Sequence, residues 1–288
     1  AVVLRTYVAE AGKQDEGGVD VTPPPYGACM AFDLHSHTTY SDGHAGPFDL
    51  ARMAWAGGLD GLAVSDHDTT AHFEEAAEAC ATFGLCWVPA VELSAEVAAA
   101  PGTGDSPRSV HLLAYFVDAE GPLSTELERL RTARRDRALA MVDALNAHGA
   151  DIDPSPLLQM GDTVSLGRPH VARLMVRSGL VPTTGQAFAQ WLGEGCPAYV
   201  PKGALDPVRC VELVRASGGA AVLAHPTWGG GDRGLLDAMC TAGLAGIESP
   251  RDQYEPDAAR AWRRIAAQRG LVVTHGSDFH GEAQSASM

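Results

Sequence analysis

The sequence of 288 residues lacks long hydrophobic runs, a recognisable secretory signal and any excess of positive charge. No apolar stretch approaches the roughly 20 residues that a membrane-spanning helix needs. The N-terminus has none of the charged, apolar and small-residue zones of a signal peptide. We therefore expect a cytoplasmic protein with no membrane partner.

Paired cysteines and basic surfaces are also missing. The six cysteines are scattered and form no Cys-x-x-Cys pair, so we expect reduced thiols rather than a disulfide framework. The formal net charge of −15 argues against broad adhesion to nucleic acid. No DNA partner and no obligate protein partner are predicted, and an anionic substrate would need local positive charge or metal ions.

The residues that are present predict an α/β fold. Short apolar or β-branched runs, each followed in most cases by a helical stretch, occupy residues 32–34, 61–64, 85–91, 110–117, 220–223, 246–247 and 271–274. Most runs carry a His, Asp or Glu at the C-terminal end, including Glu248. Loops at the C-terminal rim of a (β/α) barrel converge on one pocket, so contributions from so many strands favour a barrel over an open sheet.

Histidine and carboxylate residues at these ends predict a metal site. His35 and His37 share a face of an extended segment, and Asp278 and His280 repeat this spacing near the other end of the chain. Between these pairs stand Asp42, His67, Glu92, His111 and His225. A single histidine in a loop is usually solvated, but repetition at strand ends weakens that alternative. Imidazole and carboxylate ligands suit manganese, iron or zinc better than calcium or magnesium.

Residues 121–205 break the strand and helix alternation. Thr125 and Glu128 resemble a capping box at the start of a long amphipathic helix. Pro169 and Gly179 mark the start and end of another helix. We expect a helical insertion that forms a lid. The predicted organisation is a flexible leader at 1–29, a first barrel part at 30–120, the insertion at 121–205 and a second barrel part at 206–288.

The insertion also contains candidate phosphate ligands. A group of arginines comprises Arg129, Arg131, Arg134, Arg135 and Arg137. These side chains could form a solvated helix face paired with acidic neighbours, or Arg134 and Arg135 could contact phosphate. At Arg168 and His170, a helix N-terminus offers free N–H groups to an anion and Arg168 offers a bidentate fork.

The ordered motifs resemble those of the PHP (polymerase and histidinol phosphatase) family from residue 31 to about 281. They are Asp33-Leu34-His35-Ser36-His37, Tyr40-Ser41-Asp42-Gly43, Ser65-Asp66-His67-Asp68, Val91-Glu92-Leu93-Ser94, Ala224-His225-Pro226 and Gly276-Ser277-Asp278-Phe279-His280. The resemblance implies a distorted (β/α)7 TIM-like barrel with a helical insertion domain. It also implies two to three divalent metal ions, with manganese expected first and zinc or iron as alternatives.

The resemblance further implies three ligand sets. One metal takes His35, His37, Glu92 and Asp278; a second shares Glu92 and adds His111 and His225; a third takes Asp42, His67 and His280. Glu92, Asp278 and His225 are also expected to be catalytic. Asp66 and Asp68 are expected to orient ligands or to stabilise the loop. His44, His72, His148 and His275 match no motif position and are left out of the site.

Within the family, residues 167–172 and 197–202 resemble the branch of nucleoside 3',5'-bisphosphate phosphatases and the related 5'-to-3' RNA exonuclease. This implies phosphate contacts by Arg134, Arg135, Arg168, His170 and Lys202. The expected activity is phosphoric ester hydrolysis by a metal-bound hydroxide, on the 3'-phosphate of such bisphosphates or on short 5'-phosphorylated RNA. A histidinol-phosphatase-type enzyme and a non-catalytic, metal-stabilised accessory module remain alternatives. The branch commonly continues Gly-Ile-Glu with an aromatic residue and a His, whereas this chain has Ser249-Pro250, which leaves substrate choice open.

Overall fold

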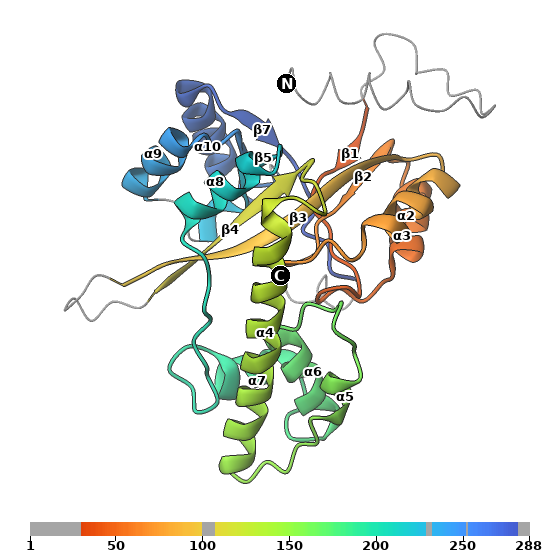
Figure 1. Cartoon of the computed structure of the whole chain (residues 1–288), viewed down its shortest axis with the longest axis vertical. Helices are drawn as coiled ribbons and strands as arrows, with labels where there is room; N and C mark the ends of the chain where they lie inside the picture. The colour runs from red at the N-terminus through yellow and green to blue at the C-terminus, as the bar shows by residue number, and fades with distance from the viewer. Residues whose placement is uncertain (1–29, 100–106, 229–231, 252, 282–288) are drawn as a thin grey trace.

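The computed structural model describes residues 30–99, 107–228, 232–251 and 253–281 (Figure 1). The predicted leader at 1–29 therefore lies outside the described residues. A search of the described helices finds none with the length and apolar character needed to cross a membrane.

A curled seven-stranded sheet forms the centre of this mixed α/β fold, and its strands follow one another in sequence order. The strands are β1 (Phe32–Asp33), β2 (Gly61–Val64), β3 (Cys86–Val97), β4 (Arg108–Tyr115), β5 (Ala220–Leu223), β6 (Gly246–Glu248) and β7 (Val272–Thr274). Each lies at one of the apolar runs in the sequence, so the prediction of these strands is confirmed.

Strand β4 departs from the predicted parallel alternation. It pairs antiparallel with both β3 and β5, while the remaining neighbours are parallel. The prediction that strand 85–91 ends just before Glu92 is wrong, because β3 continues to Val97 and pairs with β4 along its length. Glu92 therefore lies inside β3. In the register of this pair Glu92 faces Leu113 and Ser94 faces His111, so Glu92 and His111 are diagonal neighbours on one face.

The two ends of the sheet approach each other beyond β1 and β7. Ser36 and Phe279 form an isolated parallel bridge, the Leu34 N–H donates to the His275 carbonyl at 3.2 Å, and the Asp278 N–H donates to the His35 carbonyl at 2.8 Å. These bonds bring the first and last sequence motifs side by side, although more than 200 residues separate them in the sequence.

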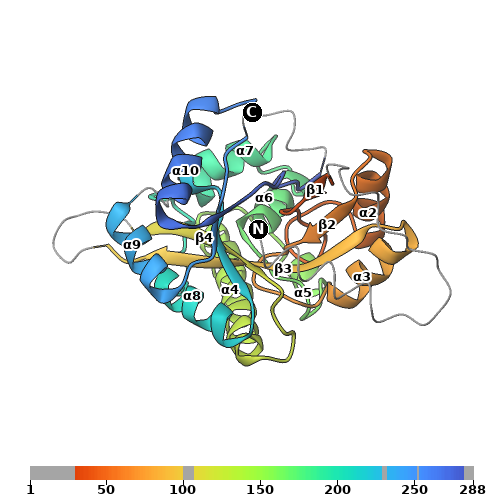
Figure 2. The ribbon, with the colours of Figure 1, turned by 90° about the horizontal axis from the view of Figure 1, so that it is seen from above.

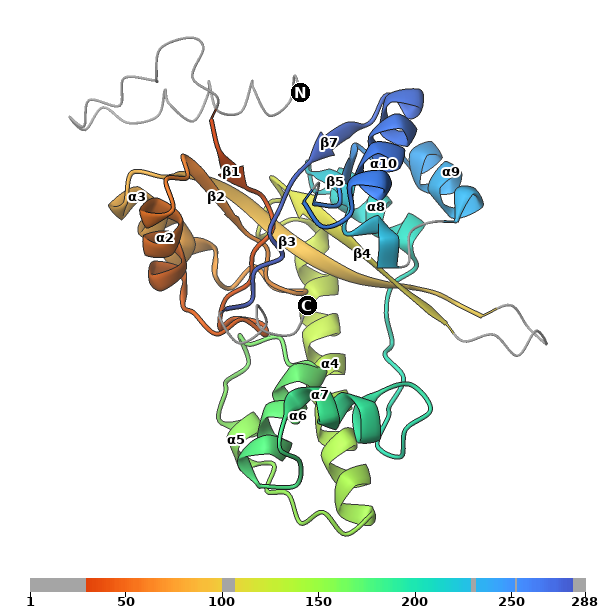
Figure 3. The same ribbon diagram turned by 180° about the vertical axis from the view of Figure 1, so that it is seen from behind.

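Helices cover the outer faces of the curled sheet. They are α2 (Pro47–Ala56), α3 (Phe73–Thr82), α8 (Pro207–Ala216), α9 (Arg233–Ala242) and α10 (Pro256–Arg269), with a short 3-10 turn, η2, at Pro226–Trp228. Helices α2 and α3 flank the β1–β2 side, and α8, α9 and α10 flank the β5–β7 side (Figures 2 and 3). Leu50 of α2 and Ala79 of α3 pack with Leu62 in one buried cluster, so burial of apolar surface holds these layers together.

The segment between β4 and β5 contains α4 (Pro122–Ala147), α5 (Ser155–Leu158), α6 (Arg168–Arg177), α7 (Thr184–Ala187) and the π-helix η1 (Phe188–Leu192). Helix α4 extends from the sheet to the other helices of this segment (Figure 1). Leu123 and Leu127 at its start pack in the sheet core. Met141 and Leu145 near its end belong to a separate apolar cluster of the segment, which also includes Met175.

The predicted boundaries of these helices are partly wrong. Helix α4 begins at Pro122 after Gly121, so Thr125 lies inside the helix and the predicted capping box is not its start. Proline suits a first helical position because its fixed φ matches the helix and its missing N–H needs no partner there. In α6, Pro169 is the second helical residue rather than the first as predicted. Gly179 follows the helix end as predicted, and its φ is 75°.

Candidate metal centre

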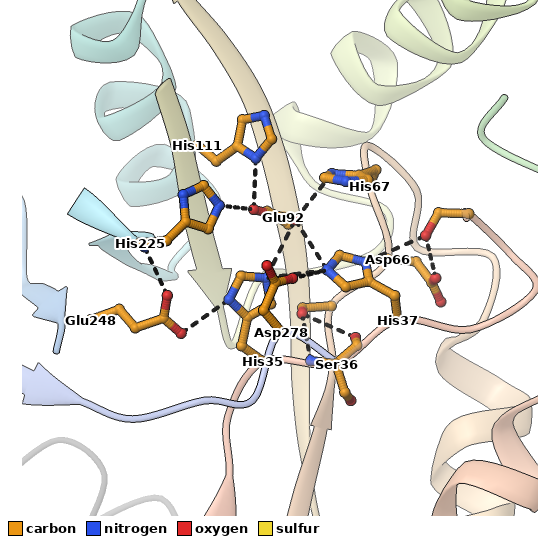
Figure 4. Close-up of polar contacts among 12 residues, drawn as sticks. His35, Ser36, His37, Asp66, His67, Glu92, His111, His225, Glu248 and Asp278 are labelled. Carbon is orange, nitrogen blue, oxygen red and sulfur yellow. Dashed lines mark hydrogen bonds and ion pairs between the residues drawn. The ribbon is translucent and has the colours of Figure 1, made fainter. Parts of the chain in front are cut away.

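His35 and His37 direct their rings toward one point because the chain beyond β1 alternates its side chains. Ser36, between them, faces the opposite side and donates through Oγ to the Ala63 carbonyl at 2.7 Å. Both imidazoles are fully buried. Figure 4 shows them beside Glu92 of β3 and Asp278, which lies beyond β7.

These four side chains form a first cluster. The Nε2 atoms of His35 and His37 are 3.1 Å apart. Each lies 3.2 or 3.3 Å from Glu92 Oε2 and from Asp278 Oδ1. Ligand atoms bound at about 2.1 Å to one divalent ion, at angles between 90° and 109°, would be about 3.0–3.4 Å apart. The spacing of these atoms therefore fits coordination of a single ion.

The other carboxylate oxygen of Glu92 faces a second group. Glu92 Oε1 lies 2.8 Å from His111 Nδ1 and 3.0 Å from His225 Nε2, and we call these three residues the second cluster. Burial lowers the pKa of His111, although Glu92 opposes this shift. Because its two oxygens face different histidines, Glu92 has the arrangement of a carboxylate shared between two adjacent cations.

The third cluster contains Asp42, His67 and His280. Asp42 Oδ1 lies 3.3 Å from His280 Nε2 and 3.9 Å from His67 Nε2. The Nδ1 of His280 donates to the Asp278 carbonyl at 2.9 Å, which leaves its Nε2 lone pair facing Asp42. His67 Nδ1 is also 3.1 Å from Glu92 Oε2, so this ring lies between the third cluster and the other two.

The structure places the predicted ligands side by side, but their grouping differs from the expected sets. His225, expected in the second set, is absent from the three groups below, although its Nε2 lies 3.0 Å from Glu92 Oε1. Side-chain atoms close enough to share an ion occur in three groups: His35, His37, Glu92 and Asp278; His37, Asp42, His67 and His280; and His67, Glu92 and His111. The expected first set recurs unchanged. His37 and His67 each fall in more groups than predicted because the clusters are contiguous.

The buried carboxylates and imidazoles of the first cluster strongly shift one another's pKa. Burial alone would lower the pKa of His37, but hydrogen bonds with Asp278 and Glu92 raise it to about 10. Burial would also lower the pKa of His35, but the nearby carboxylates raise it, and Glu248 has the largest raising effect. Burial would raise the pKa of Glu92 and Asp278, but the surrounding imidazoles hold both well below their usual range. Both carboxylates therefore remain ionised, the form that binds metal ions.

A buried aspartate supports the loop that carries His37 and Asp42. Asp66 accepts hydrogen bonds from the Thr38 N–H at 2.8 Å, from Thr38 Oγ1 at 2.5 Å and from Ser41 Oγ at 2.6 Å. Its carboxylate is therefore occupied by the loop itself. The predicted structural role of Asp66 is confirmed.

Glu248 is a functional candidate whose role no sequence motif indicated. Its Oε1 accepts from His35 Nδ1 at 3.0 Å, and its Oε2 accepts from the His225 N–H at 2.8 Å (Figure 4). The first bond leaves Nε2 of His35 directed at the cluster, which is the usual way in which an outer carboxylate orients a metal-binding histidine. The signals in the sequence were its position at the end of an apolar run and its place in the Gly-Ile-Glu stretch shared with the family branch.

Replacing Glu248 with glutamine should weaken divalent-metal binding by about 10- to 100-fold, since partners of this kind typically contribute that much. Glutamine keeps the size of the side chain but turns an amide N–H toward one of the two donors. Titration of the metal-free protein with Mn²⁺ would measure the change. An unchanged affinity would mean that the orientation of His35 does not depend on Glu248.

The predicted phosphate contacts on α4 have protein partners. Arg134 donates to Asp68 Oδ2 at 2.6 Å, to Ser94 Oγ at 2.5 Å and to the Leu166 carbonyl at 3.2 Å. Arg135 donates to the Gly161 carbonyl and lies 3.1 Å from Asp162. Both guanidinium groups connect α4 to other segments, which the sequence could not reveal because their partners are distant in the chain.

The remaining predicted phosphate contacts have different surroundings. Arg168 lies over the Phe188 ring, 5.6 Å from its centroid. His170 is buried, and its Nδ1 accepts from the Gly167 N–H at 3.0 Å, which makes it part of the start of α6. Lys202 donates to Ser109 Oγ at 2.7 Å. Of these three residues, His170 is the one whose side chain is buried.

The buried ring of His170 should make folding sensitive to acid. Burial, with repulsion from Arg173, lowers its pKa to about 4, against about 6.5 in an unfolded chain. The unfolded state therefore binds more protons between these values. The contribution of His170 to stability is complete above pH 6.5 and is lost as the pH falls toward 4.

A His170→Gln variant, which retains an acceptor for the Gly167 N–H, should lose less stability on acidification than the original protein. The difference in free energy of unfolding between the two should change by about 2 kcal/mol between pH 7.5 and 5. Denaturant unfolding of both metal-free proteins at the two pH values would measure it. A difference that stays constant would show that the ring titrates normally.

Comparison with known proteins reveals related enzymes over most of the chain. A 5'-3' exoribonuclease of Haemophilus influenzae is 33% identical over 256 residues, which cover 86% of this chain and 89% of the relative. A 3',5'-nucleoside bisphosphate phosphatase of Chromobacterium violaceum is 31% identical and covers 88% of each chain. No model of a known protein family matches the sequence.

A solved structure shares the same architecture. It is described as a metal-dependent phosphoesterase of Bifidobacterium adolescentis, and it superposes with a TM-score of 0.78 at 32% identity. The superposition covers 88% of this chain and 89% of that one. The similarity therefore extends over both the curled sheet and the helices between β4 and β5.

Proposed function

The chain belongs to the PHP family of metal-dependent phosphoesterases, and we propose that its substrate is a phosphorylated nucleotide. As a member of this family it is a metal-dependent hydrolase of phosphate esters. We propose that it removes the 3'-phosphate of nucleoside 3',5'-bisphosphates or shortens 5'-phosphorylated RNA. The named activities of the two relatives support this choice, because one is an exoribonuclease and the other is a nucleoside bisphosphate phosphatase. The substrates of both carry more than one phosphate group.

The single observation that carries the proposal is the shared carboxylate of Glu92, whose two oxygens face separate groups of histidines. We propose that the three clusters hold two to three divalent ions, with manganese as the first candidate and zinc or iron as alternatives. Such ions would lower the pKa of water and stabilise negative charge on the phosphoryl oxygens. Glu92, Asp278 and His225 would hold them in place against the reacting phosphate.

We also propose that the curled sheet is a distorted (β/α)7 barrel in which β4 is reversed, and that residues 121–205 form a substrate-binding insertion. The contacts between the ends of the sheet support the barrel. Two hydrogen bonds support the substrate-binding role of the insertion. Arg134 donates to Asp68, next to His67, and Arg173 donates to the carbonyl of Asp42 at 3.0 Å. The insertion therefore borders the clusters directly.

A phosphate-release assay with Mn²⁺-loaded protein tests the proposed substrate. It compares adenosine 3',5'-bisphosphate, adenosine monophosphates, histidinol phosphate and a short 5'-phosphorylated RNA, each with and without a chelator. We expect chelator-sensitive release that is fastest with the bisphosphate or the RNA. A preference for histidinol phosphate would instead assign the enzyme to the small-molecule branch. Metal binding without release from any of these compounds would favour the accessory module.

A further inference from the structure

The ligands of the first and third clusters are held in place by different parts of the molecule. In the first cluster, the Asp278 N–H donates to the His35 carbonyl at 2.8 Å, and Glu248 orients the His35 ring. These bonds join residues that lie at the ends of sheet strands. Asp42 and His280 of the third cluster, by contrast, lie beside α6 of the insertion.

Arg173 of α6 contacts the loop that carries Asp42. Its Nη1 donates to the Asp42 carbonyl at 3.0 Å and lies 3.4 Å from Nε2 of His44. This nitrogen carries two N–H groups, so it can serve both acceptors. Burial lowers the pKa of Arg173, and the carboxylate of Asp42 opposes the shift. The guanidinium group therefore lies within electrostatic reach of the third cluster.

His44 extends this contact to the chain at His280. The backbone N–H and the Nδ1 of His44 both donate to the His280 carbonyl, at 2.8 and 2.9 Å. With Nδ1 as the donor, the neutral ring presents Nε2 to Arg173 as an acceptor. Gly281 has a φ of 120°, and a Cβ there would lie 2.8 Å from the Cβ of His44. A displacement of His44 would therefore also move His280.

Two further hydrogen bonds join the insertion to the same region. The Ser165 N–H donates at 2.9 Å to the carbonyl of Tyr40, two residues before the aspartate of the third cluster. Arg134 donates at 2.6 Å to Asp68, the residue after His67. The insertion therefore contacts the chain close to each ligand of the third cluster, directly or through His44.

The charge of Arg173 and its hydrogen bonds would act on an ion of the third cluster in opposite directions. A guanidinium group near a divalent cation repels it. The hydrogen bonds instead favour the ion, because they hold the loops from which Asp42 Oδ1 and His280 Nε2 approach to 3.3 Å, the spacing of two ligands on one ion. Residues that orient metal ligands typically contribute a factor of about 10 to 100 in affinity.

We propose that Arg173 is a positioning residue for the ion of the third cluster. It holds Asp42 directly and His280 through His44, so the insertion sets the affinity of this ion, whereas bonds at the ends of the sheet strands hold the ligands of the first cluster. This inference rests on the proposed function for the presence of a third ion.

Titration of the metal-free protein with Mn²⁺, followed by the electron paramagnetic resonance signal of the free ion, measures each binding step without turnover. The His280→Ala variant identifies the step that belongs to the third cluster, because it removes one of its ligands. Arg173→Lys keeps the charge but loses the planar fork that reaches both acceptors. It should weaken that step by about 10- to 100-fold and leave the other steps within about twofold.

Arg177→Lys is the matched control, because Arg177 lies on the same helix and is exposed. It should leave every binding step unchanged. His44→Ala is the second variant and should weaken the same step as Arg173→Lys. His44 is exposed, so its replacement should not prevent folding.

Arg173→Met separates position from charge, because it removes the hydrogen bonds together with the positive charge. Weaker binding of the third ion in both Arg173 variants would support the proposal. Unchanged binding in Arg173→Lys, or tighter binding in Arg173→Met, would overturn it. A protein in which His280→Ala weakens no binding step has no third ion and would overturn it as well.

Phosphate release at increasing Mn²⁺ concentration provides a second readout. Arg173→Lys should need about 10 to 100 times more Mn²⁺ but should then reach the original kcat, as mass action requires for a weakened site. A kcat that stays low at saturating Mn²⁺ would overturn the proposed role. The titration needs no substrate, so its result stands even if the bisphosphate is not hydrolysed.

Discussion

Replacing Glu92 with glutamine should lower kcat/KM for phosphate release by about a thousandfold or more. The side chain faces two clusters at once, so its loss removes a charged ligand from each. Metal ions contribute several kcal/mol to a phosphoryl-transfer transition state, and each 1.36 kcal/mol corresponds to a factor of ten in rate. Glutamine keeps the shape of the side chain, so the fold should be retained.

Steady-state kinetics and metal content of the same protein samples would measure this effect. A Glu78→Gln variant, which changes an exposed carboxylate on α3, serves as the control and should behave like the original protein. Circular dichroism would establish that Glu92→Gln is folded. A folded Glu92→Gln enzyme with activity within tenfold of the original would exclude the shared role of this carboxylate.

A single methyl group at Gly276 should also disable the metal centre. A Cβ at this position would lie 2.2 Å from the Cβ of His35, 2.8 Å from the backbone nitrogen of His35 and 2.8 Å from Glu248 Oε1. Two of these atoms are the Cβ and the backbone nitrogen of His35, which cannot rotate away, so His35 has to move. A displacement of about 1 Å in an active site can reduce the rate a hundredfold.

We therefore expect Gly276→Ala to lose about a hundredfold in kcat/KM and to bind Mn²⁺ more weakly. Gly185→Ala on α7 is the matched control, since the nearest atom to its new Cβ would be 3.9 Å away. Kinetics and metal titration of the two variants would measure the difference. Equal metal affinity in both would mean that the contact between Gly276 and His35 does not fix the ligand.

Local sequence patterns predicted the positions of the strands and identified the candidate metal ligands. Apolar runs marked the positions of β1 to β7. The signal is clearest in strands such as β2 and β5, where residues on both faces are buried and are therefore apolar. The two-residue spacing of His35 and His37 placed both rings on one face for a purely geometric reason. Position at strand ends then brought distant ligands such as Asp278 to the same place.

The errors arose where long-range pairing decides the structure. The extension of β3 beyond Glu92 and the reversal of β4 depend on pairing between the two strands, which apolar periodicity does not encode. The partners of Arg134 and Glu248 are distant in the sequence, so no local pattern identifies them.

Anomalous diffraction from crystals grown with Mn²⁺ would test the shared metal centre, since it locates the ions themselves. We expect one manganese peak within bonding distance of His35, His37, Glu92 and Asp278, and a second on the side of Glu92 that faces His111 and His225. Crystals of active enzyme with manganese bound elsewhere, and no peak beside Glu92 or Asp278, would contradict it.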